Sequence, residues 1–116
     1  MLNQTVLVGR LVRDPELFET ENGNKIASIT LAVPRSYKNI NGEYDTDFIP
    51  CTLWKGIAEN AVEYCHKGDL LGIKGSLKTR RIEQEEYSHQ IVEVVAEKVT
   101  YLTSKSRKEK DDEADE

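Results

Sequence analysis

The sequence predicts an all-β domain, a small closed barrel of five strands with one short helix between the third and fourth strands. Segments rich in β-branched and aliphatic residues recur between turn dipeptides, and only one segment changes to the period of a helix. The 116 residues, 38% hydrophobic and 32% charged, fit one small soluble domain. We therefore expect one domain and not a multidomain enzyme.

The first two predicted strands cover residues 6–12 and 26–33, where Val, Ile and Leu dominate. The polar stretch between them contains Pro15 and the turn dipeptide Asn22-Gly23. Proline and Asn-Gly both interrupt regular structure, so we expect the chain to reverse here.

The third predicted strand, residues 48–54, follows the second across Asn41-Gly42. This dipeptide readily takes the positive φ angles of a two-residue type I′ turn. We therefore expect the second and third strands to pair as a hairpin.

One helix and two further strands complete the predicted order. Strand character returns at residues 70–82 and 90–102, around a polar turn at 83–86, and Gly68 is placed to end the helix that precedes them. The helix is predicted from apolar residues at helical spacing, namely Ile57, Ala58, Ala61, Val62 and Cys65. Five closely spaced strands favour a barrel, because closure removes exposed sheet edges, and the Greek-key oligonucleotide/oligosaccharide-binding (OB) fold has this strand count.

The two ends of the chain carry expectations of their own. Residues 104–116 contain Ala114 as their only hydrophobic residue, so we expect a short disordered charged tail after a domain at residues 1–103. The N-terminus lacks a basic segment followed by an apolar one, and no apolar stretch approaches the ~20 residues that cross a bilayer. These features predict a cytoplasmic protein.

The charge and the cysteines exclude few functions. The formal net charge is -5, of which residues 1–103 contribute -3 and the tail -2, but binding depends on the local field of a groove rather than on this sum. Cys51, Cys65, His66 and His89 have no finger-like spacing, so we predict buried free thiols and neither a metal nor another cofactor.

One face of the predicted hairpin gathers aromatic residues. In the two-residue loop register the numbers of paired residues sum to 83, so that Arg35 opposes Phe48. Alternation assigns Ile49, Cys51 and Leu53 to the core, although a bulge or a longer loop would change the register. The opposite face is then predicted to hold Arg35, Tyr37, Tyr44, Phe48, Thr52 and Trp54.

The fourth strand adds a basic side. Leu71, Ile73, Gly75 and Leu77 share one face, and the other face is predicted to hold Lys74, Ser76, Lys78, Arg80 and Ile82. If the basic side adjoins the aromatic one, rings for stacking are bordered by cations, with Lys38 and Lys55 nearby. Such a surface suits single-stranded nucleic acid, because unpaired bases expose π-faces that a duplex hides.

Several segments resemble bacterial and phage single-stranded DNA-binding proteins (SSB). They are VLVGRLVRDPEL at residues 6–17, ITLAV at 29–33, TLWKGIAE at 52–59, and YCHKG followed by GSLKTR between 64 and 80. The resemblance spans residues 1–103. It implies an OB-fold homotetramer, nucleoid-associated and not an enzyme, that binds and protects single-stranded DNA during replication, recombination and repair.

The resemblance also implies roles for individual residues. Base stacking falls on Tyr37, Phe48 and Trp54. A fourth aromatic residue expected after the basic run at 78–81 is replaced by Ile82, and Tyr87 in the adjacent turn is the alternative ring. Phosphate contacts are expected from Arg35, Lys55, Lys74, Lys78 and Arg80.

The C-terminus and the remaining alternatives limit these expectations. Many SSB proteins end in an acidic tip with a Pro-Phe pair, whereas this chain ends in DDEADE at residues 111–116, like abbreviated or phage-encoded members, so partnership with replication and recombination proteins stays open. Three alternatives also stay open. They are an OB-fold subunit that favours RNA or a replication-restart complex, a small nuclease with clustered carboxylates, and a structural oligomerisation module.

Overall fold

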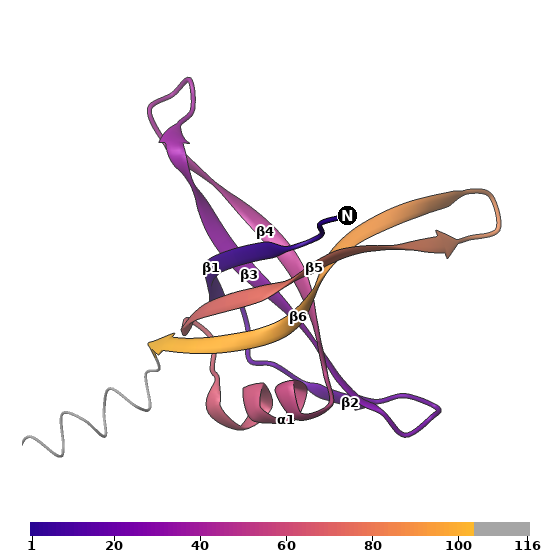
Figure 1. The fold of residues 1–116 in the computed structure, drawn as a ribbon. Helices are drawn as coiled ribbons and strands as arrows, with labels where there is room; N and C mark the ends of the chain where they lie inside the picture. Colours follow the sequence, from indigo (N-terminus) through magenta and orange to yellow (C-terminus); the bar gives the residue numbers. More distant parts are fainter. Residues whose placement is uncertain (104–116) are drawn as a thin grey trace, which may run out of the picture.

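The computed structural model describes residues 1–103, which form a barrel with two long projecting hairpins (Figure 1). The tail predicted at 104–116 lies outside the described residues. None of the helical residues within 1–103 belongs to a segment that could span a lipid bilayer.

Six strands and one helix make up the described part of the chain. In order they are β1 (Thr5–Leu11), β2 (Leu17–Glu19), β3 (Lys25–Lys38), β4 (Tyr44–Trp54), α1 (Lys55–Tyr64), β5 (Leu70–Glu83) and β6 (Ser88–Thr103). The five predicted strands and the predicted helix between the third and fourth of them are confirmed. The short strand β2, which pairs with the start of β3, was not predicted.

The barrel closes through two pairings between strands that are distant in sequence. Strand β1 pairs with β5 along most of its length and with β3 at its end, where Leu11 opposes Leu31. Strands β4 and β6 run parallel, with Thr52 opposite Val95. The resulting ring, β1-β3-β4-β6-β5, is the connectivity of the predicted OB fold.

The core fills the inside of this ring, and α1 covers one end of it (Figure 1). Ala58 and Ala61 of α1 are buried against the strands. Cys51 and Cys65 are both buried, as predicted, and burial raises the pKa of the Cys51 thiol to about 12. The largest fully buried side chains are Leu31, Leu53, Leu71, Ile73, Cys51 and Cys65.

The turn at Asn41-Gly42 is a three-residue loop, so the predicted two-residue turn is wrong. The Asn39 N–H donates to the Glu43 carbonyl (2.7 Å) and the Gly42 N–H donates to the Asn39 carbonyl (3.0 Å). Gly42 has φ 79° but Asn41 does not have a positive φ, whereas a type I′ turn needs both. The Asn39 side chain explains the difference, because its Oδ1 accepts hydrogen bonds from the N–H groups of Asn41 and Glu43.

The register of the β3–β4 hairpin changes accordingly. Beyond a shift between Pro34 and Lys38, Ala32 pairs with Phe48, where the sequence analysis placed Arg35. Pro34 pairs with Thr46 and Lys38 pairs with Tyr44, so four residues of β3 span the same length as two residues of β4. Because the difference is an even number, the inward and outward alternation of both strands continues through the bulge.

Gly75 provides a test of the barrel packing. A Cβ at this position would overlap the carbonyl oxygen of Val95, beside the register shift between β5 and β6. Because backbone cannot retreat as a flexible side chain can, Gly75→Ala should lower the free energy of unfolding by about 1–3 kcal/mol. Urea unfolding followed by circular dichroism at fixed protein concentration measures this loss.

Gly56 supplies the matched control, since a Cβ there meets nothing within 4 Å and the residue lies in α1. Gly56→Ala should leave stability unchanged or raise it by up to about 1 kcal/mol. Equal stability of the Gly75→Ala protein and the wild type would contradict the close approach of β5 and β6.

Candidate nucleic-acid interface

The outer face of β4 carries two exposed rings. Phe48 is 64% exposed and Trp54 38% exposed. They alternate along the strand with Cys51 and Leu53, which are buried. The predicted separation of an aromatic face from a core face on this strand is therefore confirmed.

The basic side of β5 adjoins this aromatic face through β6. The Thr52 hydroxyl donates to Glu93 Oε2 at 3.0 Å, and Arg80 Nε lies 3.8 Å from the same oxygen. Lys78 pairs with Glu93 across the β5–β6 ladder and so shares its face. We call this face of the sheet the platform; it is made of Phe48, Thr52, Trp54, Lys78, Arg80 and Glu93, of which Thr52 is buried.

The cations of the platform differ in how far their charge is offset. Arg80 lies beside the Glu93 carboxylate, whose side chain is only 17% exposed. Lys78 and Lys55 form no ion pair within residues 1–103. Lys55 has φ 53°, the only positive φ of a non-glycine residue in that range, and it marks the change from β4 to α1 directly after Trp54. Near the rings, the positive charges of Lys55 and Lys78 are therefore the ones that no carboxylate neutralises in an ion pair within residues 1–103.

Arg35 and Tyr37 lie on the opposite side of the β3–β4 hairpin from Phe48. The Arg35 guanidinium donates to Asp47 from Nη2 (2.9 Å) and Nε (3.1 Å), and it lies 3.8 Å from Asp45. Both aspartates alternate with Phe48 along β4. The Asp47 carboxylate, and to a smaller extent the exposed Tyr37 phenol, raise the pKa of the Arg35 guanidinium.

The prediction that these two residues share a face with Phe48 is therefore wrong. The longer loop and the bulge together change the sum of paired residue numbers from 83 to 80 at this point. An odd change moves the β3 residues that this register assigned to the other face relative to Phe48. Tyr37 remains an exposed ring, but it faces the other side of the hairpin.

Lys74 and Ile82 lie farther from the rings of β4. Lys74 shares a cross-strand row with Val6 of β1 and Lys98 of β6. Ile82 is half-buried near the end of the β5–β6 hairpin, opposite His89. The alternative ring, Tyr87, is exposed and stacks on His89 with ring centroids 5.7 Å apart.

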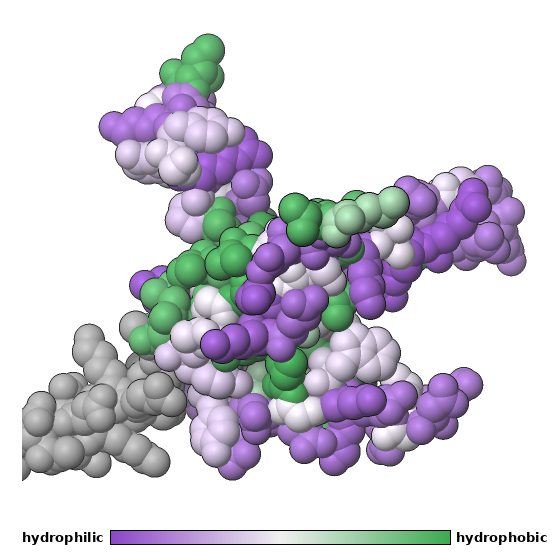
Figure 2. Space-filling view, viewed as in Figure 1, coloured by the Kyte–Doolittle hydropathy of each residue, from purple (hydrophilic) through white to green (hydrophobic). Residues whose placement is uncertain are grey.

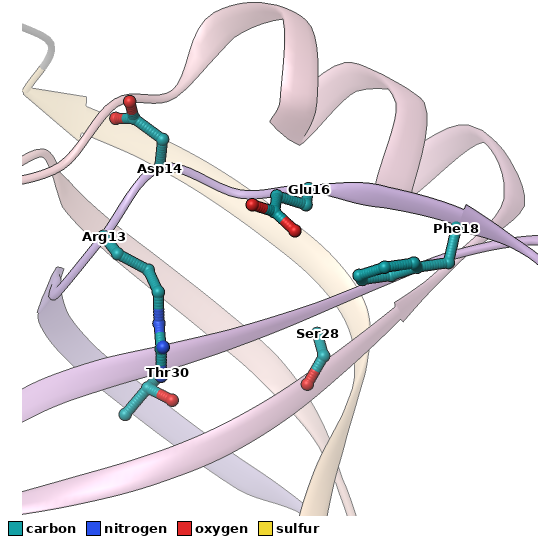
Figure 3. A pocket seen from close by; sticks show the side chains of 6 residues that line it. All are labelled: Arg13, Asp14, Glu16, Phe18, Ser28 and Thr30. Carbon is teal, nitrogen blue, oxygen red and sulfur yellow. The ribbon is translucent and has the colours of Figure 1, made fainter.

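The structure also contains a pocket that was not predicted from the sequence. It has a volume of about 280 Å³ and lies between the segment that leads into β2 and the outer face of β3 (Figure 3). Arg13 and Phe18 stand on two of its sides. The signal in the sequence is the turn at Asn22-Gly23. In the structure this turn is a three-residue loop, and that loop length places Phe18 opposite Ile26.

Within residues 1–103, no three His, Cys, Asp or Glu side chains lie close enough together to hold a metal ion. The polar groups of the platform are the Thr52 hydroxyl, the Trp54 indole N–H, the Glu93 carboxylate and the cations of Lys78 and Arg80. This donor set can bind anions and polar bases.

The closed barrel with exposed rings and cations on one face defines an OB-fold protein of the nucleic-acid-binding class. The chain belongs to the single-strand binding protein family, whose sequence model matches residues 2–102. The resemblance found in the sequence motifs is thereby confirmed.

The chain is similar both to a relative of about its own length and to longer relatives, of which it spans little more than half. It is 46% identical over 108 residues to single-stranded DNA-binding protein B of Bacillus subtilis (strain 168), covering 92% of this chain and 96% of that protein. It is 45% identical over 111 residues to the single-stranded DNA-binding protein of Lactiplantibacillus plantarum, covering 95% of this chain but 56% of that protein. It is 47% identical over 107 residues to single-stranded DNA-binding protein A of Bacillus subtilis (strain 168), covering 91% of this chain and 62% of that protein.

The Arg35–Asp47 contact predicts an acid-shifted titration. The hydrogen bond from Arg35 holds the pKa of the Asp47 carboxyl below its ordinary value. The contribution of this contact to stability is therefore complete at neutral pH and is lost as the pH falls through the folded-state pKa. In an NMR titration of the carboxyl carbons, Arg35→Gln should move the pKa of Asp47 up toward that of an ordinary aspartate.

Lys38→Gln serves as the control, because Lys38 is a cation of the same hairpin that lies over the Tyr44 ring at 5.8 Å. This variant should leave the Asp47 titration in place. The interpretation fails if Asp47 titrates at the same pH in the wild type and in Arg35→Gln.

Proposed function

We propose that this protein binds and protects single-stranded DNA, with little dependence on sequence, during replication, recombination and repair. The observation that carries the proposal is the platform, where the rings of Phe48 and Trp54 adjoin Lys78 and Arg80 on one face of the sheet. Membership of the single-strand binding protein family and the names of the relatives support it. The work proposed is binding rather than catalysis, in the cytoplasm with the nucleoid.

The proposed binding combines stacking with phosphate contacts. Every base has a π-face, so rings bind unpaired bases of any kind, and a duplex hides these faces. Three rings, Tyr37, Phe48 and Trp54, at ~1–3 kcal/mol per stacked base contribute ~3–9 kcal/mol per subunit before ordering costs. Lys55, Lys78 and Arg80 are proposed to contact the phosphates between the stacked bases, and Arg35 and Lys74 those farther along the strand.

The two faces of the β3–β4 hairpin set the path of the proposed strand. Phe48 and Tyr37 are both exposed but lie on opposite sides of this hairpin. A strand that uses both rings must therefore cross the hairpin instead of running along one face. Near Arg35 it meets a cation whose charge Asp47 and Asp45 largely offset, so stacking rather than charge should dominate there. Ile82, or Tyr87 beside it, is proposed to bound the site at the end of the β5–β6 hairpin.

A homotetramer is the proposed assembly. Residues Thr5–Gly9 of β1 pair with β5 on one side only, which leaves one edge of the strand open. Val6, 71% exposed, and Val8 lie on the outer face of this strand. Figure 2 shows hydrophobic residues gathered over β1 and its surroundings. An open strand edge beside an apolar patch favours contact with a second copy of the chain.

We propose residues 1–103 as the DNA-binding domain and residues 104–116 as a charged tail outside it. The tail carries 4 basic and 6 acidic residues. Its acidic end could compete with DNA for the platform, and protein partners of the tail are left to experiment.

Trp54→Ala is expected to weaken binding to oligo(dT) by ~1–3 kcal/mol, because one stacking ring is removed while the cations stay in place. The slope of log K against log[salt] should hardly change, since no phosphate contact is lost. Titration at two salt concentrations, followed by fluorescence anisotropy of a labelled strand, measures both quantities. Wild-type affinity of this variant would refute the proposed role of the platform.

Lys78→Ala is the complementary control for the same titration. It should reduce the salt slope by about 0.7, the share of one phosphate contact with a single strand. Competition with RNA of the same sequence and with duplex DNA separates the proposal from an RNA-binding subunit. Incubation of a labelled single strand with magnesium, which would show cleavage by a nuclease, separates it from that alternative. Assembly of the wild type without affinity for any oligonucleotide would favour a structural module.

Val8→Lys is expected to disrupt the proposed tetramer, because a charged side chain replaces an apolar one in the contact. Sedimentation equilibrium of the wild type should give four times the 13.2 kDa mass of the chain, and the variant a smaller multiple. Ile40→Lys, at a fully exposed loop tip, introduces the same charge elsewhere and should leave the assembly unchanged. A monomeric wild type rules the tetramer out.

A further inference from the structure

The pocket beside the platform has the size and lining of a site for one small aromatic ligand. Its volume of about 280 Å³ is close to the lower end of the ~300–1,000 Å³ usual for ligand pockets. In Figure 3 the Phe18 ring reaches in from one side and the Arg13 side chain bounds the other, with Ser28 and Thr30 beneath. The lining thus combines an aromatic face, a cation, two hydroxyl groups and the carboxylates of Asp14 and Glu16.

The pocket lies on the same face of the sheet as the rings of β4. Phe18 pairs with Ile26 in the β2–β3 ladder, and Ile26 pairs with Trp54 in the β3–β4 ladder. Paired residues share a face, so these three side chains form one cross-strand row. With neighbouring strands ~4.8 Å apart, Phe18 lies two strand spacings from Trp54. Its exposed fraction of 53% leaves the ring accessible.

The floor of the pocket continues into the platform in the same way. Ser28 pairs with Thr52, and Thr30 pairs with Pro50, which lies between Phe48 and Thr52 along β4. A strand that stacks on the β4 rings therefore passes within one strand spacing of the pocket floor. A base of that strand can reach the pocket without leaving the face.

The two carboxylates of the pocket have different roles. Asp14 Oδ1 accepts a hydrogen bond of 2.7 Å from the Lys67 N–H, and in Figure 3 its carboxylate points away from Phe18. The Glu16 carboxylate lies instead above the space between Arg13 and Phe18 (Figure 3). Glu16 forms no ion pair within residues 1–103, so its oxygens are available as acceptors inside the pocket.

We propose that this pocket takes one nucleobase of the bound strand and prefers a base with an exocyclic amino group. The Phe18 ring stacks on the base, Arg13 contacts the adjoining phosphate, and Glu16 accepts a hydrogen bond from the amino group. Cytosine, adenine and guanine carry such a donor, whereas thymine has no exocyclic amino group and presents carbonyl oxygens that the carboxylate repels. The result is a modest base preference added to binding that is otherwise insensitive to sequence, and it rests on the proposed function.

The stacking role is tested with Phe18→Leu, which keeps an apolar side chain but removes the ring. Affinity for oligo(dC) and oligo(dT) of equal length should fall at least about fivefold, the lower end of the loss for one stacked base. Phe18→Tyr keeps the ring and should bind like the wild type. Wild-type affinity of Phe18→Leu for both oligomers would overturn the proposal.

The amino-group preference is tested with Glu16→Ala against Glu19→Ala. Both variants lose one negative charge, but Glu19 lies on the other face of β2 from Phe18, so a general electrostatic gain should be equal in the two. Only Glu16→Ala should lower the ratio of dC to dT affinity, by about two- to tenfold, the share of one hydrogen bond. Equal ratios in the two variants would overturn this preference.

The same titrations separate this inference from the proposed function. If Trp54→Ala weakens binding while Phe18→Leu and Glu16→Ala behave like the wild type, the pocket proposal fails and the platform stands. If the wild type binds no single strand, or if Trp54→Ala has no effect, the proposed function fails first.

Discussion

Strand β4 contributes to the core with one side and to the platform with the other, and the rest of the site depends on this alternation. Cys51 and Leu53 are buried within the barrel. Because successive side chains of a strand point to opposite faces, their burial turns Phe48 and Trp54 outward. A one-residue slip of β4 would exchange the two sets, which would place aromatic rings in the core and open the barrel packing. The same hydrophobic burial that stabilises the fold therefore positions the rings.

Closure of the barrel then assembles the platform from distant parts of the chain. The parallel pairing of β4 with β6 brings Thr52 next to Glu93, which is 41 residues away in sequence, and the β5–β6 ladder adds Lys78 and Arg80. One end of the barrel is covered by α1, whereas the rings of Phe48 and Trp54 on the outer face of β4 stay exposed (Figure 1). Two projecting hairpins enlarge this face beyond what the barrel alone offers (Figure 1).

The distribution of charge explains how a chain with net charge -5 can present a cationic face. Asp45 and Asp47 are engaged with Arg35, and Glu93 with Thr52 and Arg80, so these carboxylates are tied to particular partners. Lys78 stays unpaired within residues 1–103. Binding of a polyanion responds to such local fields rather than to the net charge. Glu16, directed into the pocket, is suited to a base edge rather than to a phosphate.

The sequence by itself determined the five strands of the barrel, the single helix, the two faces of β4 and the family, because hydrophobic periodicity and short motifs are local properties of the chain. It did not determine the hairpin loops, since the hydrogen bonds that the Asn39 side chain accepts from the backbone N–H groups of Asn41 and Glu43 outweighed the preference of Asn41-Gly42 for a shorter turn. Only the tertiary structure decided that Arg35 and Tyr37 face away from Phe48 and that Phe18 joins the row of Trp54. These placements depend on strand register and barrel closure, which are set by contacts between residues far apart in sequence.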